Sequence, residues 1–415
     1  METKKEQEKV ILVGVQTTET DSDFAYSLDE LAQLTETALG KVVGELTQKR
    51  ERFDPRTFLG KGKLEELTHL VEETEADVVI FNHALTPGQT RNIQEVSDVK
   101  IIDRIQLILD IFAMRARSKE GKLQVELAQL QYMLPRLAGQ GINLSRLGGG
   151  IGTRGPGETK LETDRRHIRN QISDIKRALK DTERHRERNR IHRRESGIFQ
   201  IGLMGYTNAG KSTLLNALTQ AKTFEENQLF ATLDPLTRKL VLPIGTTVTL
   251  TDTVGFIQDL PTELIEAFQS TLEETRSVDL LLHVVDASAE NMAGHERTVI
   301  DLLKKLEMDH IPMLTVYNKK DLVDGLFFPS LYPNLLISAK DPADIEILLE
   351  EITNQMQEVM VPYQIEVGVE EGQKLVQLKQ ETLVTAETYE EETNRYLVKG
   401  YAKKESKWNG ENQLK

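Results

Sequence analysis

The chain has 415 residues, a net charge of −14 and no cysteine. Its length predicts about two to four domains, and the absence of cysteine excludes disulfides and thiolate metal sites and favours a reducing cytoplasm. The charged N-terminus lacks the apolar core of a signal peptide and no apolar run approaches the ~18 residues of a membrane span, so we expect a cytoplasmic protein that does not cross a membrane.

Residues 1–110 alternate short apolar runs with segments of helical periodicity. The apolar runs predict strands at Lys9–Gln16, Lys41–Gln48, Ala76–Asn82 and Val99–Ile105. Ser27 and Glu30 have the spacing of a capping box at a helix start, and Pro87 fits the first turn of another helix. Strand–helix alternation of this kind predicts a small parallel α/β subdomain.

Residues 111–195 change to a helical period with narrow apolar seams. One seam is formed by Leu123, Leu127, Leu130, Leu134 and Leu137, and the other by Leu161, Ile168, Ile172, Ile175 and Leu179. Two such helices joined by one loop predict an antiparallel helical hairpin, whose second arm starts at the capping box Thr159–Glu162. The loop from Ala138 to about Glu158 would form its tip.

The predicted tip is rich in glycine, with eight glycines among residues 138–160, and it contains a GxGxxG at Gly150–Gly155. A dinucleotide fingerprint needs a strand before it and a helix packed on the same sheet. A helix with a leucine seam precedes this loop instead, which disfavours a phosphate cradle. We expect a probe with few side chains, because glycine lets the backbone approach RNA closely.

The second arm is basic although the chain is acidic. Residues 164–194 hold twelve Lys and Arg against five Asp and Glu. This is the footprint expected for a phosphate backbone, and the alternative is a charge run that only solvates a helix face. Lys61 and Lys63 are weaker candidates, and the main candidate RNA contacts are Arg146, Gly149, Gly150, Arg154, Lys160, Arg165, Arg166 and Arg169. We predict no DNA partner.

Residues 196–362 return to strand–helix alternation and contain a P-loop, Gly205-x4-Gly210-Lys211-Ser212, between a predicted strand and helix. Its glycines let backbone N–H groups surround phosphates, Lys211 reaches the β and γ oxygens, and Ser212 ligates Mg²⁺. The candidate phosphate-binding residues are Gly205, Tyr206, Thr207, Asn208, Ala209, Gly210, Lys211, Ser212 and Thr213.

Three further motifs follow in the order expected of a GTPase. Asp252-Thr253-Val254-Gly255 ends a strand, with Asp252 near Mg²⁺ and the Gly255 N–H at the γ-phosphate. Asn318, Lys319 and Asp321 lie in NKKD, where the Asp321 carboxylate can accept from guanine N1–H and the 2-amino group, which adenine lacks. Ser338, Ala339 and Lys340 offer a backbone N–H to guanine O6. GTP/GDP and Mg²⁺ are therefore the predicted ligands.

Hydrolysis would involve Lys211, Thr232 and Gly255. Thr232 is the best candidate for the switch threonine that contacts Mg²⁺ and γ-phosphate, and the less favoured alternative is a loop threonine without a role. Phe256 stands where many GTPases place a glutamine that orients water, so we expect slow intrinsic hydrolysis. Asn208 is a candidate for helping to bind K⁺.

The C-terminal segment, residues 363–415, is expected to form a small β-α-β-β unit from about Ile365 or a partly ordered extension.

The chain resembles the HflX family of translation-factor-class GTPases along nearly its whole length. The similarity rests on FLGKGKLEEL, LQVELAQLQYMLPRL, GGGIGTRGPGETKLETDRR, GYTNAGKSTLLNAL, FATLDPLTR and DTVGFIQDLP. It implies an N-terminal α/β subdomain, a helical hairpin and a G domain. It also implies binding to the large ribosomal subunit and its rRNA, and splitting of stalled or idle ribosomes, often under stress. No firm motif matches the family after about residue 365.

The predicted fold class is α/β, a P-loop GTPase domain preceded by the small parallel subdomain and the hairpin, with a small C-terminal α+β segment. We expect a monomer. Two other functions remain open: a signalling switch whose hairpin docks a protein effector, and an ATP-dependent RNA remodeller with its own N-terminal nucleotide site. RNA binding should weaken steeply with salt, whereas protein docking through an apolar seam should not.

Overall fold

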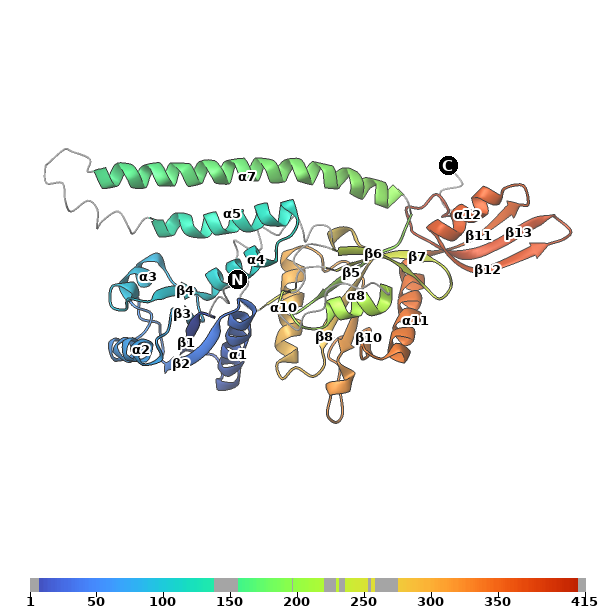
Figure 1. Ribbon diagram of the computed structural model, residues 1–415. Coiled ribbons are helices and arrows are strands. Elements are labelled where there is room, and N and C mark those ends of the chain that lie inside the picture. The colour runs from blue at the N-terminus through green and yellow to red at the C-terminus, as the bar shows by residue number, and fades with distance from the viewer. Residues whose placement is uncertain are drawn as a thin grey trace, which may run out of the picture. The chain divides into compact units, whose positions relative to one another are not determined.

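The computed structural model describes residues 7–137, 156–195, 197–219, 229–230, 236–252, 255–257 and 275–409, and within the long helix 156–195 it describes the side chains of 162–182. The chain divides into two compact units, residues 1–181 with 260–268, and residues 182–259 with 269–415 (Figure 1). None of the described helices is long and apolar enough to cross a membrane.

The first unit begins with a four-stranded sheet in the order β2-β1-β3-β4, with all neighbours parallel. Its elements are β1 (Lys9–Gln16), α1 (Asp21–Thr37), β2 (Lys41–Lys49), α2 (Lys61–Thr74), β3 (Val78–Phe81), α3 (Pro87–Gln94), β4 (Lys100–Asp103) and α4 (Arg104–Arg115). Apart from Lys9 and Lys100, the residues of β1, β3 and β4 are buried, as expected of a parallel sheet that is covered on both faces. The predicted parallel α/β arrangement is confirmed. The subdomain boundary expected at residue 110 falls inside α4.

One predicted helix start is confirmed and one is wrong. α3 begins at Pro87, and Thr86 and Gln89 form its capping box. α1 begins at Asp21 with Thr20 as its N-cap, six residues before Ser27. Glu30 is not a capping residue because its buried carboxylate accepts a hydrogen bond from Arg104.

Two helices follow, α5 (Lys119–Arg136) and α7 (Pro156–Glu195), and Figure 1 shows them running antiparallel. α7 already begins at Pro156, so the capping box predicted at Thr159 lies inside the helix and is wrong as a start. Ile175 is buried, whereas Ile168, Ile172 and Leu179 are half-buried. The predicted seam of α7 therefore coincides with its least exposed described face.

The leucine seam of α5 is less buried than predicted. Leu127 is buried, but Leu123, Leu130, Leu134 and Leu137 are half-buried. Deeper burial belongs to an adjacent face with Val125, Ala128 and Tyr132. The Tyr132 hydroxyl donates to Asp103 Oδ1 at 2.8 Å, and Arg136 Nη2 lies 3.2 Å from Asp103 Oδ2. This second face of α5 is thus held against the end of β4 in the first sheet.

The second unit contains a six-stranded sheet in the order β10-β9-β8-β5-β7-β6, parallel except for β6. Its elements are β5 (Gln200–Gly205), α8 (Lys211–Thr219), β6 (Leu236–Val241), β7 (Thr247–Asp252), η2 (Thr275–Ser277), β8 (Leu280–Asp286), α10 (Met292–Lys305), β9 (Met313–Asn318), η3 (Lys320–Leu322), β10 (Asn334–Leu336) and α11 (Pro342–Val359). The core between the sheet, α8 and α11 includes Leu214, Leu282 and Leu348. Because β5, β7, β8 and β9 are parallel, their carboxyl ends lie at the same edge of the sheet.

The C-terminal segment forms an antiparallel sheet in the order β11-β13-β12 with one helix. Its elements are β11 (Val361–Gly368), α12 (Gly372–Glu381), β12 (Leu383–Glu390) and β13 (Arg395–Ala402). Of the two arrangements left open, the β-α-β-β unit is the one observed. Lys403 Nζ donates to Ile198 O at 2.7 Å and so links the segment to the start of the G-domain sheet.

Candidate nucleotide-binding site

The P-loop connects β5 to α8 at the carboxyl edge of the sheet. A Cβ on Gly205 would lie 2.1 Å from the Val284 carbonyl oxygen, so only glycine allows β5 to approach β8 this closely. Asn208 and Gly210 have φ of 60° and 92°, in the left-handed region. The backbone thus makes the tight turn that directs loop N–H groups and the start of α8 toward an anion.

Lys211, Ser212 and Asp252 come together beside this loop. The ammonium of Lys211 donates to the carbonyl oxygens of Gly205 and Tyr206 at 3.0 and 2.8 Å. The Ser212 hydroxyl donates to Asp252 Oδ2 at 3.1 Å, and Asp252 is fully buried at the end of β7. A hydroxyl and a carboxylate are oxygen donors of the kind that Mg²⁺ prefers, so these two residues fit the predicted metal.

Gly255 lies against the same cluster. A Cβ at this position would be 3.1 Å from Lys211 Nζ and 3.0 Å from Thr207 Cγ2, which leaves little room for any side chain. The Gly255 backbone is therefore close to the lysine predicted to hold the γ-phosphate. Thr232, the candidate switch residue, lies outside the described residues, and Thr213 is half-buried in the first turn of α8.

Asn318 connects the P-loop to the loop that follows β10. Its amide Nδ2 donates to Ala209 O at 2.9 Å, and its Oδ1 accepts from the Ala339 backbone N–H at 2.9 Å. The Asn318 side chain is buried, so both contacts are shielded from water. A single amide thus holds the phosphate-binding and base-binding loops in register.

The predicted base-binding residues lie together at the end of β9. The Ser338 hydroxyl donates to Asp321 Oδ1 at 2.7 Å, and Lys340 Nζ is 3.8 Å from Asp321 Oδ2. This hydrogen bond from Ser338 is the main cause that lowers the pKa of Asp321. Asp321 is therefore an ionised acceptor at neutral pH, and it remains partly exposed to a ligand.

Sequence reasoning missed three side chains that support these loops. Lys319, in the left-handed conformation, donates to Asp286 Oδ2 at 2.6 Å, and Asp344 accepts the Ser338 backbone N–H at 2.8 Å. The ring of Tyr206 stacks on His295 with centroids 3.8 Å apart. Asp286 could have been found as the acidic end of a buried strand, whereas nothing in the local sequence marks Asp344 or His295.

Comparisons with known proteins identify GTPases that are similar to most of this chain. A family model described as GTP-binding GTPase N-terminal matches residues 25–113, one described as GTP-binding GTPase Middle Region matches residues 115–193, and one described as 50S ribosome-binding GTPase matches residues 200–319. GTPase HflX of Alkalihalophilus pseudofirmus is 53% identical over 396 residues, which cover 95% of this chain and 94% of the relative. GTPase HflX of Escherichia coli is 41% identical, covering 93% and 91%.

The chain belongs to the HflX family of GTPases. A solved structure of a GTP-binding protein from the archaeon Sulfolobus solfataricus in complex with GDP is also similar, with a TM-score of 0.44 and 23% identity, covering 84% of this chain and 98% of that one.

In this HflX-family chain, the residue after DxxG is buried. Phe256 is 2% exposed, its backbone N–H donates to Gly205 O at 3.1 Å, and its carbonyl accepts from the Thr207 N–H at 2.7 Å. The phenyl ring has no hydrogen-bonding atom and does not face solvent. The Phe256 side chain therefore cannot orient a water molecule in this conformation.

The charge state of Lys211 predicts that nucleotide binding is sensitive to pH. Burial lowers the pKa of Lys211 to about 8, and the neighbouring Asp252 carboxylate opposes that shift. Phosphates would raise this pKa again, so binding should take up a proton. We expect a larger proton uptake per GDP at pH 8.5 than at pH 7.5, because more of the free Lys211 is deprotonated at the higher pH.

Calorimetric titration with GDP in two buffers of different ionisation enthalpy measures this uptake. Affinity should also fall as the pH rises from 7.5 to 8.5, because the deprotonated fraction of free Lys211 increases. Equal uptake at the two pH values would show that Lys211 does not change its charge on binding.

The candidate RNA contacts of the hairpin lie mostly outside the described residues or their side chains. Arg146, Gly149, Gly150 and Arg154 are outside, and for Lys160 only the helical backbone is described. Arg166 and Arg169 are exposed on α7, whereas Arg165 is half-buried beside the seam. Lys63, a weaker candidate, pairs with Glu66 at 2.8 Å.

Proposed function

We propose that this chain is a GTP-dependent factor that binds the large ribosomal subunit in the cytoplasm and splits stalled or idle ribosomes. The observation that carries the proposal is the basic exposed face of α7 in a chain whose net charge is −14. A family model described as 50S ribosome-binding GTPase matches its G domain, which supports the same partner.

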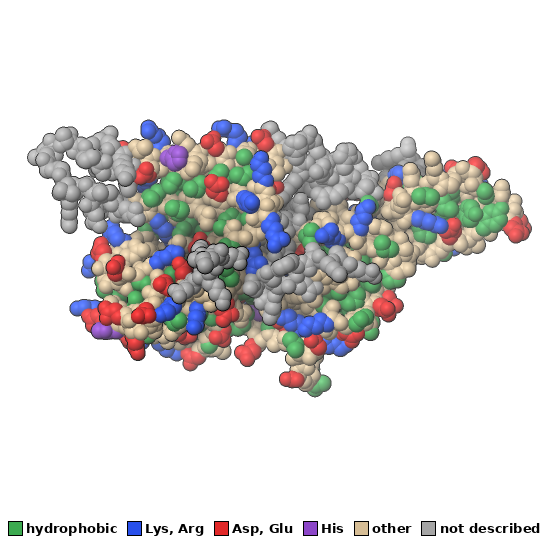
Figure 2. Space-filling view, viewed as in Figure 1, with side chains coloured by type: hydrophobic (Ala, Val, Ile, Leu, Met, Phe, Trp, Pro, Cys, Tyr) green, Lys and Arg blue, Asp and Glu red, His purple; other side chains and the backbone are tan. Residues whose placement is uncertain are grey.

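The described part of α7 separates apolar and basic residues. Ile168, Ile172, Ile175 and Leu179 lie on the less exposed side, whereas Arg166, Arg169, Lys176, Arg177 and Lys180 are exposed. Figure 2 shows Lys and Arg side chains over this stretch, with some acidic ones among them. Arg177 alone of these five cations has an ion pair among the described residues, with Asp174 at 3.5 Å. The others are available to phosphates.

GTP would be held by the residues already described. Lys211 would exchange its two carbonyl contacts for phosphate oxygens, Asp321 would accept from the guanine edge, and Asn318 would keep the two loops together. Ser212 and Asp252 would hold Mg²⁺, which when bound neutralises charge on the phosphates. Thr232 is proposed as the switch residue, and Asn208, exposed in the P-loop, as a K⁺ contact.

Hydrolysis by this site should be slow without a partner, because the buried Phe256 leaves water unpositioned. We therefore propose that ribosomes supply the missing orientation and that hydrolysis then releases the factor. Turnover of GTP measured with and without large subunits tests this step, and we expect a rise of about tenfold or more. Equal, fast rates would contradict it.

The hairpin is tested by reversing two exposed charges, Arg166→Glu with Arg169→Glu. We expect ribosome splitting, followed by light scattering, to slow by about tenfold or more, because each lost phosphate contact weakens binding and reduces its salt dependence. GTP affinity should not change, since neither residue belongs to the G domain.

Lys304→Glu with Lys305→Glu is the matched control, because both residues are exposed on α10. If the α7 pair splits ribosomes as fast as the unmodified chain, the basic face is only solvated. If binding is lost without any salt dependence, the hairpin docks a protein effector instead.

A further inference from the structure

A cavity of about 310 Å³ lies at the amino-terminal ends of the strands of the first sheet. It is bounded by the end of α1, the starts of β1, β3 and β4, and one side of α4. This volume is in the range of small-molecule sites. The cavity belongs entirely to the first unit and is independent of the GTP site.

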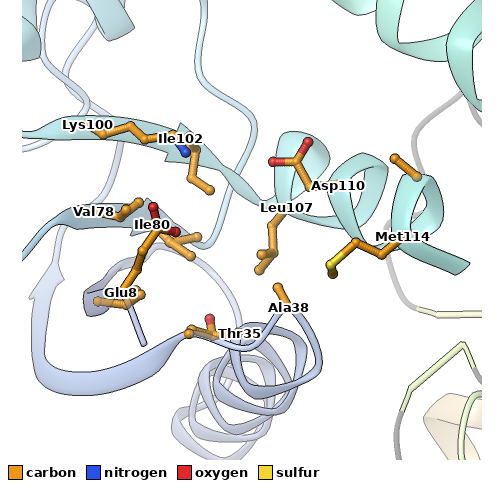
Figure 3. A pocket seen from close by; sticks show the side chains of 13 residues that line it. Glu8, Thr35, Ala38, Val78, Ile80, Lys100, Ile102, Leu107, Asp110 and Met114 are labelled. Carbon is orange, nitrogen blue, oxygen red and sulfur yellow. The ribbon is translucent and has the colours of Figure 1, made fainter. Parts of the chain in front are cut away.

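Most of the cavity wall is apolar. Figure 3 shows Leu107 and Met114 of α4, Ile80 and Ile102 of the strands, and Ala38 after α1 around the same space. Such walls favour the transfer of an alkyl group of a ligand from water into the cavity. A polar or strongly hydrated ligand would gain nothing from them.

One wall residue conflicts with the pattern of its helix. Asp110 stands between Leu109 and Ile111, which are 1% and 0% exposed, in the apolar stretch of α4. In the described part of the chain its carboxylate makes no hydrogen bond or ion pair, although it is half-buried. Burial raises the pKa of Asp110, and the positive charge of Lys100 partly opposes that shift. A carboxylate in this position costs stability unless something else offsets the cost.

The charges around the cavity favour a cation. Glu8 and Asp110 are acidic and Lys100 is basic, so the lining carries one net negative charge. The Thr35 hydroxyl donates to Leu31 O at 2.9 Å, which leaves its lone pairs to accept from a ligand N–H. An anion would have only the Lys100 ammonium as a charged donor in the lining, against the carboxylates of Glu8 and Asp110.

We propose that this cavity binds a small aliphatic amine in its ammonium form, with Asp110 as the counter-ion and the apolar wall around the alkyl chain. α4 is joined to α5 by Ala116–Ser118, and α4 packs against both α1 and α5. An occupant held between α1 and α4 therefore lies at the base of the first hairpin arm.

The test is calorimetric titration of the full chain with n-pentylammonium and, separately, with 1-pentanol. We expect saturable binding of one n-pentylammonium, weakened about tenfold or more by Asp110→Asn, because a charge-assisted hydrogen bond is lost. Asp98→Asn is the matched control, since Asp98 is exposed in the same subdomain and does not line the cavity. Hydrogen exchange should show protection at 35–40 and 104–115.

Stability gives a second readout for the same variant. The folded-state pKa of Asp110 is raised, so its ionised form disfavours folding above that pKa. At neutral pH, the free energy of unfolding of Asp110→Asn should therefore equal or exceed that of the unmodified chain. A lower free energy of unfolding would mean that Asp110 has a structural role. Equal binding of 1-pentanol, absence of n-pentylammonium binding, or unchanged binding by Asp110→Asn would each overturn the proposal.

Discussion

Asp321→Asn is expected to lower GTP affinity by about a hundredfold and to transfer the preference of the site to xanthosine triphosphate. The carboxylate would accept hydrogen bonds from two N–H groups of guanine, and each charge-assisted hydrogen bond would contribute substantially to affinity. In asparagine one acceptor becomes an amide donor, which opposes the guanine 2-amino group but matches the 2-oxo group of xanthine.

The structure favours a local effect of this change. Ser338 donates to Asp321 Oδ1, and an amide oxygen can accept the same hydrogen bond. Asp324→Asn, at an exposed position three residues later, removes the same charge outside the base-binding loop and should bind GTP normally. Competition binding with GTP, ATP and xanthosine triphosphate gives the result. An unchanged preference for GTP would show that Asp321 does not contact the base.

Gly210→Ala is expected to weaken nucleotide binding strongly. A Cβ at Gly210 would lie 2.2 Å from Asn318 Nδ2, so the amide that joins the two loops must move. Movement breaks its contacts with Ala209 and Ala339, and each buried group left unpaired costs about 1–3 kcal/mol. We therefore expect GDP affinity, measured by calorimetry, to fall by about a hundredfold or more.

Gly245→Ala is a matched control for backbone strain. Gly245 has φ of 86°, close to the 92° of Gly210, but a Cβ there would meet nothing within 4 Å. Its free energy of unfolding should fall by about 1 kcal/mol, with GDP affinity unchanged. Equal losses of affinity in both variants would mean that strain, not displacement of Asn318, controls the site.

The alternation of strands and helices and the nucleotide motifs could be predicted from sequence, because both depend on local spacing. The P-loop, Asp252 and NKKD each end a strand, and parallel strands bring their carboxyl ends to one edge. Helix starts were harder. Ser27 and Glu30 match the sequence pattern of a capping box. The Glu30 carboxylate is instead buried and accepts a hydrogen bond from Arg104, which is 74 residues away.

The supporting contacts of the site could not be predicted for the same reason. Asp344 and His295 touch Ser338 and Tyr206 only because α11 and α10 pack on particular strands. The deeper burial of the α5 face with Tyr132 likewise depends on Asp103, which lies in a different element. Tertiary partners of this kind leave no period or spacing in the local sequence.

The central claim is tested most directly by co-sedimentation with large ribosomal subunits, comparing a non-hydrolysable GTP analogue with GDP. The Lys211→Ala variant serves as the control for the nucleotide. The proposed function predicts that the chain sediments with the subunits when the GTP analogue is bound and mostly stays in the supernatant with GDP or after Lys211→Ala. Absent binding, or equal binding in all three conditions, would contradict it.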